Sequence, residues 1–142
     1  MPRIMRSMAA ISRCANQYRT KELSALGLKG NQSIYLLQIC RHPGLTQDQL
    51  ARNLTMDKSA VARQLTCLEE LGYVRRETTA NDKRVLLVYP TQKAQEALPE
   101  IHWVLRAWED LITADLSPES REALIGALET MHSRALRWAK ED

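Results

Sequence analysis

Residues 56–76, MDKSAVARQLTCLEELGYVRR, carry the pattern of a helix with two different sides. At about 100° per residue, three apolar side chains fall within about 60° of one another and predict the side that packs against a core: Val61, Leu65 and Leu68. The opposite side carries short polar and basic side chains: Ser59, Arg63 and Thr66, with Lys58 and Ala62 beside them near the first turn. The helix therefore has an outer side that is available for binding.

A second, shorter helix is predicted directly before it. Thr46 and Gln49 form the Thr-x-x-Gln pattern of a capping box, which predicts a helix from 47 to about 53. Asp57 is a favourable N-cap for the next helix, which we expect over 58–71 with a glycine at its end. Two helices joined by such a tight turn are typical of a helix-turn-helix, whose second helix lies in the major groove of DNA.

The outer side of the helix over 58–71 suits this groove. Arg63 can donate two parallel hydrogen bonds to guanine O6 and N7, Ser59 can bind a base edge or a phosphate, and Ala62 can contact a thymine methyl group. The backbone N–H groups at the helix start can bind a phosphate. Any one exposed side chain is more often an ordinary solvated residue, so the DNA hypothesis depends on the neighbouring elements.

A β-hairpin is predicted next, because YVRRET (73–78) and RVLLVY (84–89) are strand-like and are joined by a polar turn. Arg84 could enter the minor groove beside the recognition helix, where the negative potential is strong. Lys83 could contact a phosphate, and Asp82 could hold Arg84 through a charge-assisted hydrogen bond. The alternative is an ordinary polar turn.

Four further helices are predicted on the two sides of this central part, over 4–22 and 30–41 and over about 92–113 and 118–140. The first and last carry apolar side chains along one side that a small domain would leave uncovered. A second copy of the chain is the simplest partner for such sides.

The residues 45–76, LTQDQLARNLTMDKSAVARQLTCLEELGYVRR, and 81–95, NDKRVLLVYPTQKAQ, resemble the MarR family of winged helix-turn-helix regulators. The Asp-x-Arg of Asp82 and Arg84 matches the wing pattern of that family. The outer helices match in pattern, so the resemblance covers nearly the whole chain. It implies a mainly α fold with a small β-hairpin wing, an α+β class in which long N- and C-terminal helices mediate dimerisation.

The resemblance also implies one domain over 1–142, with a DNA-binding lobe over 30–90 and dimerisation helices over 1–22 and 91–142. A ligand-responsive homodimer, most simply a repressor, would bind a pseudo-palindromic operator in double-stranded DNA. The effector would be a small phenolic or otherwise aromatic molecule. Candidate effector-binding residues are Tyr18, Tyr35 and Trp103, although aromatic side chains more often pack in a core or an interface.

The recognition helix departs from the family pattern at two positions. Ala60 and Ala62 stand where the family usually has Thr or Ser, which removes hydroxyl contacts. We therefore expect base readout to depend more on Arg63 and Lys58. The wing is also short, which limits its phosphate contacts.

The bulk composition agrees with one soluble domain and excludes several classes of protein. The chain has 142 residues, 44% hydrophobic and 26% charged, and a net charge of +3, which permits nucleic-acid binding without demanding it. No stretch approaches the about 20 apolar residues that cross a membrane, and the N-terminus lacks the apolar core of a signal peptide. We expect a cytoplasmic protein without a membrane partner.

Oxidant or metal sensing is an alternative within the same fold. Cys14 lies in the predicted first helix, but a reactive thiol needs a lowered pKa, and inert thiols are the simpler interpretation of Cys14, Cys40 and Cys67. The histidines are scattered without the spacing of metal ligands: His42, His102 and His132. We therefore predict no metal site and no cofactor.

Catalysis finds little support in the sequence. There is no G-x-S-x-G and no Gly-rich phosphate loop, and the adjacent Glu69 and Glu70 are typical of a solvated helix side. We predict that the protein is not an enzyme. The remaining alternative is a helical interaction module that does not bind DNA.

Overall fold

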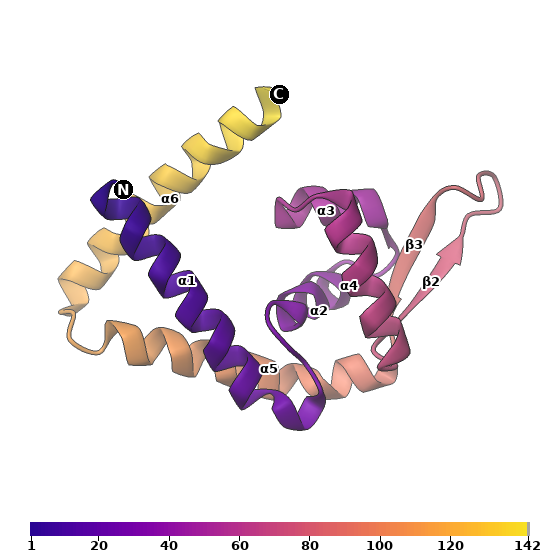
Figure 1. Ribbon diagram of the computed structural model, residues 1–142, viewed down its shortest axis with the longest axis horizontal. Helices are drawn as coiled ribbons and strands as arrows, with labels where there is room; N and C mark the ends of the chain where they lie inside the picture. Colours follow the sequence, from indigo (N-terminus) through magenta and orange to yellow (C-terminus); the bar gives the residue numbers. More distant parts are fainter. Residues whose placement is uncertain (142) are drawn as a thin grey trace. The chain divides into compact units, whose positions relative to one another are not determined.

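The computed structural model describes residues 1–141, which form six α-helices and a small sheet (Figure 1). In chain order the elements are α1 (Arg3–Glu22), the 3-10 turn η1 (Ser24–Leu26), α2 (Gln32–Arg41), β1 (Leu45–Thr46), α3 (Gln47–Leu54), α4 (Lys58–Glu70), β2 (Val74–Thr78), β3 (Leu86–Pro90), α5 (Gln92–Thr113) and α6 (Pro118–Glu141). The predicted class, mainly α with a small β-hairpin, is confirmed. Each predicted helix and both strands are present within a few residues of the expected bounds.

The chain divides into two compact units, Met1–Arg106 and the part from Ala107 onward. The first unit contains α1 to α4, the sheet and most of α5, and the second contains the end of α5 and all of α6. The assignment of the whole chain to one domain stays a prediction.

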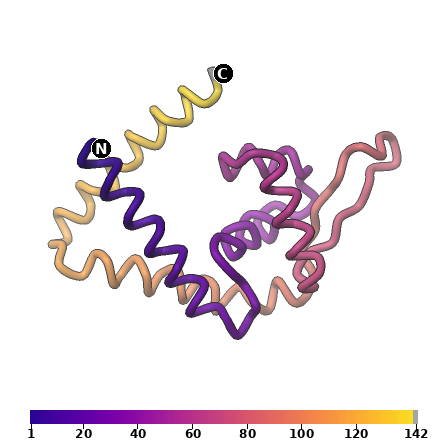
Figure 2. Tube along the Cα trace, in the orientation of Figure 1, coloured from indigo at the N-terminus to yellow at the C-terminus, as the bar shows by residue number. Residues whose placement is uncertain are grey.

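The sheet has three antiparallel strands in the order β1-β3-β2. In the predicted hairpin, Val74 of β2 lies opposite Pro90 of β3, and Thr78 lies opposite Leu86. The two-residue strand β1, in which Leu45 pairs with Val88, was not predicted. Figure 2 shows the connection between β2 and β3 reaching beyond the neighbouring helices, as a wing does.

The core of the first unit lies between α2, α4, the sheet and α5, and it fixes the side of α4 that faces inward. Its fully buried side chains include Tyr35, Leu36, Ile39, Leu50, Val61, Leu65, Leu68, Tyr73, Val88 and Ile101. All three apolar residues expected on the inner side of the helix over 58–71 are among them. That prediction is confirmed, and the opposite side of α4 is turned toward solvent.

Local hydrogen bonds explain where α3 and α4 begin. Thr46 Oγ1 accepts from the Gln49 N–H at 3.0 Å and Gln49 Oε1 accepts from the Thr46 N–H at 2.8 Å, which confirms the capping box. Asp57 Oδ1 accepts from the Ala60 N–H at 2.8 Å. Thr55, between the two helices, has a φ of 53° in the left-handed region.

The outer helices expose large apolar side chains. On α1 these are Ile4, Met5, Met8 and Ile11, and on α6 they are Leu124, Ile125, Leu128, Met131 and Trp138. Ala15 is the one buried residue of α1, and the described residues of α6 include none. Among residues 1–141, none of the helices combines the length and apolarity needed to span a lipid bilayer.

Candidate nucleic-acid interface

The outer side of α4 presents Ser59 and Arg63, which are both exposed, with the half-buried Ala62 beside them. Within residues 1–141, Arg63 forms no ion pair with a carboxylate. Its guanidinium is therefore available to an outside acceptor without the loss of an internal bond.

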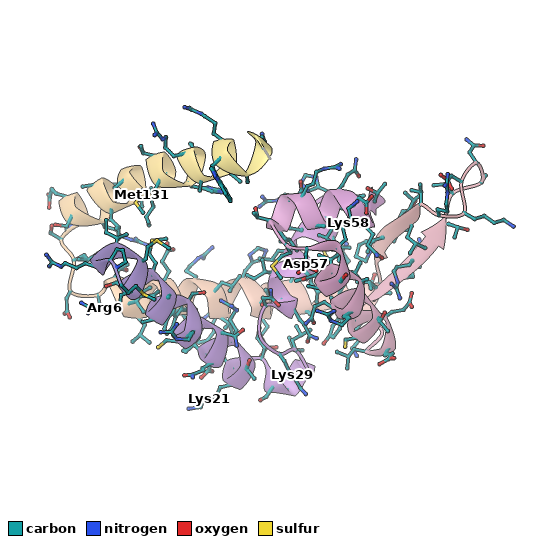
Figure 3. All side chains as sticks on the ribbon, turned by 45° about the horizontal axis from the view of Figure 1, so that its top comes forward. Arg6, Lys21, Lys29, Asp57, Lys58 and Met131 are labelled. Carbon is teal, nitrogen blue, oxygen red and sulfur yellow. The ribbon has the colours of Figure 1, made fainter. Side chains whose placement is uncertain are left out.

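The first residue of α4, Lys58, has a partner on the neighbouring helix. Its Nζ lies 3.3 Å from Asp48 Oδ2 of α3, and both side chains are exposed. Figure 3 shows Lys58 and Asp57 together at the beginning of α4, next to α3. Because a solvated pair of this kind contributes little, Lys58 can leave Asp48 for a phosphate at low cost.

The expectation that backbone N–H groups at the start of α4 bind a phosphate stays a prediction, and one of these groups is already engaged. The Ala60 N–H already donates to the carboxylate of Asp57. The negative charge of that carboxylate also repels a phosphate at the same place. Among the groups at the start of α4, the Lys58 ammonium therefore suits a phosphate better than the Ala60 N–H does.

Thr66 lies on the exposed side of α4, but its hydroxyl is engaged within the protein. It donates to the carbonyl of Ala62 at 3.0 Å and accepts from Arg76 Nη2 at 3.2 Å. A hydroxyl has a single proton to donate, so Thr66 could donate to a base only after its bond to Ala62 breaks. Its second lone pair can still accept from a base amino group.

Arg76 of β2 belongs to this region and was not singled out from the sequence. Its side chain is 17% exposed, and Nη2 lies 3.2 Å from Glu69 Oε1, while its backbone N–H donates to Glu69 Oε2 at 3.2 Å. Nη1 donates to Gln47 Oε1 of α3 at 3.4 Å. Glu69 is thus an ion-pair partner, and not only part of a solvated side as expected.

Strand alternation could have identified Arg76. Val74 of β2 is buried and Arg75 is exposed, so period-two alternation returns Arg76 to the side that faces the helices. An arginine on that side needs an acceptor. Glu69 stands before the glycine turn that joins α4 to β2, within reach of the strand.

The wing carries the predicted contact between Asp82 and Arg84. The Arg84 N–H and Nε donate to Asp82 Oδ1 at 2.9 and 3.1 Å, and Nη2 donates to Oδ2 at 3.3 Å. These bonds from Arg84 lower the pKa of Asp82. The Arg84 side chain stays 91% exposed, and Lys83 beside it is exposed as well.

Thr79 closes the wing turn, which the sequence did not indicate. Its hydroxyl donates to the carbonyl of Asp82 at 2.6 Å, and its Oγ1 accepts from the Asp82 N–H at 2.9 Å. Asp82 is therefore fixed through its backbone by Thr79, and its carboxylate can hold Arg84 in a defined direction.

The three candidate effector-binding residues occupy different environments. Tyr35 is fully buried in the core, and its hydroxyl has no hydrogen-bond partner within residues 1–141. Its pKa is raised by burial and by Asp57, against the opposing effect of Arg63. Tyr18 packs at the edge of the core, whereas Trp103 on α5 is 65% exposed.

A cavity of about 260 Å³ lies between the start of α3 and the base of the wing. It is lined by Thr46, Gln47, Asp48, Gln49, Arg52, Arg84, Val85 and Leu86. None of the three effector candidates lines this cavity, so it does not support an aromatic pocket formed by them.

The cysteines and histidines form no evident chemical centre in the described part of the chain. Cys14 and Cys67 are exposed, Cys40 is half-buried, and all three are free thiols. Burial raises the pKa of the Cys40 thiol, which disfavours the reactive thiolate. Over residues 1–141, no group of three or more His, Cys, Asp or Glu side chains is arranged to hold a metal ion.

Comparison with known proteins identifies relatives over most of the chain. Residues 26–85 match the MarR family. YybA, an HTH-type transcriptional regulator of Bacillus subtilis (strain 168), is 28% identical over 96 residues, which span 68% of this chain and 64% of YybA. A candidate regulatory protein for the hcr operon of Thauera aromatica is 30% identical over 125 residues, which span 88% of this chain and 73% of that protein.

Solved structures agree with these relatives. The crystal structure of MarR has a TM-score of 0.87 and 31% identity, with 96% of this chain and 99% of that chain covered. A candidate MarR-family transcriptional regulator from Listeria monocytogenes, crystallised with a 26mer DNA, has a TM-score of 0.86 and 26% identity, with 96% and 91% covered. Regulators of this kind bind DNA and are not enzymes. The chain therefore belongs to the MarR family of transcriptional regulators.

Proposed function

We propose that this protein is a homodimeric repressor that recognises a pseudo-palindromic operator and responds to a small aromatic effector. The observation that carries the proposal is the division of α4 between a buried apolar side and an exposed side with Ser59 and Arg63. In the wing of the same unit, the Asp82 carboxylate accepts hydrogen bonds from Arg84, whose side chain stays exposed. The similar Listeria monocytogenes regulator was crystallised with DNA, which supports a DNA target here as well.

Each protomer would place α4 in the major groove and the wing in the adjacent minor groove. Arg63 would read guanine, while Ser59 and Ala62 would contact neighbouring base edges. Thr66 would lie at the flank of this surface. The remaining basic side chains would contact phosphates and the minor groove: Lys58, Lys83 and Arg84.

Exposed apolar surface on the outer helices supports the homodimer. In one isolated chain, the side chains of Ile4, Met8 and Ile11 on α1 and of Leu124 and Leu128 on α6 are exposed. Water contact of so many large apolar groups is unfavourable, and an isologous interface between two copies removes it.

Charge supports the same partner. The residues Arg3, Arg6, Arg13 and Lys21 give α1 a basic outer surface, and Figure 3 shows Arg6 and Lys21 projecting from it. The end of α5 and the start of α6 carry acids as well. Glu109 and Asp110 already lie 3.4 and 4.0 Å from Arg121 of the same chain, whereas Asp115, Glu119 and Glu122 form no ion pair within residues 1–141. A second copy thus offers complementary charges as well as apolar cover. The whole chain would then act as one domain in the cytoplasm.

The effector would bind where aromatic side chains can be covered. Trp103 exposes a large ring on α5, and Tyr18 lies at the edge of the core. A ligand that bound one spacing of the two α4 helices better than another would shift operator affinity by that difference. Binding to an operator without effector would repress by excluding other proteins from the same DNA.

Selection of bound duplexes from random DNA tests the proposal. We expect enrichment of an inverted repeat whose half-sites lie about 34–36 Å apart, or a multiple of that spacing. Binding of the selected duplex, measured by gel shift at two salt concentrations, should weaken steeply with salt because phosphate contacts release counterions. The absence of any salt-dependent enrichment would instead favour a helical interaction module.

A further inference from the structure

We infer that Arg76 is a positioning residue that sets the base selectivity of α4 by fixing the helix against α3 and the wing strand. The inference rests on the proposed reading of DNA by α4. It assigns to Arg76 and Thr66 an action through the orientation of Arg63, and not through contacts of their own with DNA.

The contacts of Arg76 join three elements. Nη1 donates to Gln47 at the first residue of α3, and Nη2 donates to Thr66 and lies beside Glu69 in α4. The backbone of Arg76 belongs to β2, where the residue pairs with Val88 of β3. One guanidinium therefore spans the two helices of the helix-turn-helix and the wing.

The position of these contacts on α4 decides what they control. Thr66 lies three residues after Arg63, or about 60° from it around the helix axis. Arg76 thus holds α4 at the flank of the side that carries Arg63 and Ser59. A recognition site has to be held within about 0.5 Å and 10–20° of its productive geometry, so a bond at this place limits the rotation that would misdirect Arg63.

Apolar packing alone does not supply this restraint. The buried Val61, Leu65 and Leu68 bind α4 to the core through an attraction that has no preferred direction. The fork of a guanidinium fixes direction as well as distance, because its donors are coplanar.

The surroundings of Arg76 also argue against a direct phosphate contact. The side chain is 17% exposed, and the Glu69 carboxylate accepts from both its Nη2 and its backbone N–H. Its charge is therefore balanced inside the protein. Arg84, with a side chain that is 91% exposed, is a far better partner for DNA.

A matched pair of variants tests the inference: Arg76→Met and Arg75→Met. Each removes one positive charge from β2, but Arg75 is exposed on the other side of the strand, where it pairs with Glu77 and stacks on Tyr89. The measurement is the affinity of each variant for the selected operator and for duplexes with single base-pair changes, at two salt concentrations.

The selectivity ratio is the affinity for the operator divided by the affinity for a duplex with one altered base pair. We expect Arg76→Met to lower this ratio about tenfold and to leave the salt dependence of binding unchanged. Arg75→Met should keep the wild-type ratio. Arg76→Lys should restore little of the ratio, since one ammonium cannot bond to both helices. An unchanged ratio in Arg76→Met, or an equal loss on all duplexes with a weaker salt dependence, would overturn the inference. A wild-type protein without operator preference would overturn the proposed function, and the inference with it.

A double-mutant cycle with Thr66→Val gives a second test. If Thr66 acts through Arg76, Thr66→Val should lower the ratio in the wild-type background and have little further effect in Arg76→Met. Equal effects in both backgrounds would mean that Thr66 reads a base by itself. If the melting curve of Arg76→Met shows that this variant does not fold, Thr66→Val and Glu69→Gln test the same hydrogen bonds. An unchanged selectivity ratio in both of these variants would overturn the inference.

Discussion

Arg63 stands exposed on α4 without a carboxylate partner among residues 1–141, whereas Lys58 at the start of the helix is paired with Asp48. The two cations are therefore prepared for different tasks. An unpaired guanidinium can form a bidentate bond with a base at no internal cost, while a weakly paired ammonium is suited to exchange one anion for another.

Replacement of Arg63 should remove a base-specific bond. We expect Arg63→Ala to weaken operator binding by about 1–3 kcal/mol and to relax the preference at one base pair of each half-site. Quantitative gel shifts on the selected operator and its single-base variants measure both effects. Lys83→Ala is the control, because loss of a phosphate contact should weaken all sequences nearly alike; operator binding unchanged in Arg63→Ala would show that another residue reads the base.

Acid should release Arg84 from Asp82. The bonds from Arg84 lower the pKa of Asp82, so the contact is complete above the ordinary value of 3.8 and is lost as the pH falls through the lowered value. The NMR signal of Arg84 Nε–H should therefore move only in strongly acidic solution. In Asp82→Asn, the Arg84 Nε–H signal at neutral pH should already have the chemical shift that the wild-type protein reaches only in acid. A shift of this signal near neutral pH in the wild-type protein would contradict the contact between Arg84 and Asp82.

Sequence distance explains which of these residue contacts could be predicted. Asp82 and Arg84 are two residues apart, so their contact follows from the local turn. Arg76 lies ten residues from Thr66 and 29 from Gln47, and it meets them only because β2 packs beside both helices. No local pattern contains that packing, so the sequence did not indicate that the Thr66 hydroxyl would bond to Arg76.

At the scale of elements, α3 and α4 owe their limits to caps that are visible in the sequence. The capping box at Thr46 and the N-cap at Asp57 are both formed. Period and caps together therefore predicted these helices to within a few residues. Strand β1 was not predicted because its two residues are too few to show an alternation of apolar and polar side chains. It forms through pairing with β3.

Loss of the Asp57 cap should destabilise the first unit. We expect Asp57→Ala to lower the free energy of unfolding by about 1 kcal/mol, since the Ala60 N–H loses its acceptor. Urea denaturation followed by circular dichroism measures the change. Asp57→Asn is the control, because asparagine caps about as well, and a loss in Asp57→Asn as large as in Asp57→Ala would exclude capping as the cause.

At the scale of the whole molecule, the large apolar side chains of α1 and α6 stay exposed to solvent in a single chain. The buried core belongs to the first unit, and the described residues of α6 contribute none to it. Sequence patterning predicted these apolar sides, yet it could not identify their partner, because the same pattern serves any apolar surface.

A charge on the apolar side of α6 should prevent self-association. We expect the wild-type protein to sediment as a dimer and Leu128→Glu to sediment as a monomer, since an unpaired carboxylate would be buried in the interface. Analytical ultracentrifugation over a range of concentrations measures this. Glu129→Gln, at the next residue, should remain dimeric, and a dimeric Leu128→Glu would show that this side of α6 is not the interface.

The backbone conformation of Thr55 has a consequence for the engineering of this protein. A β-branched residue at a φ of 53° is sterically crowded, because its side chain approaches the backbone in the left-handed region. Glycine or asparagine would occupy the same Ramachandran basin with less repulsion. Relief of this crowding makes Thr55→Asn a natural first substitution for engineering a more heat-resistant form of this regulator. In Thr55→Gly, the greater conformational freedom of the unfolded chain would offset part of the gain.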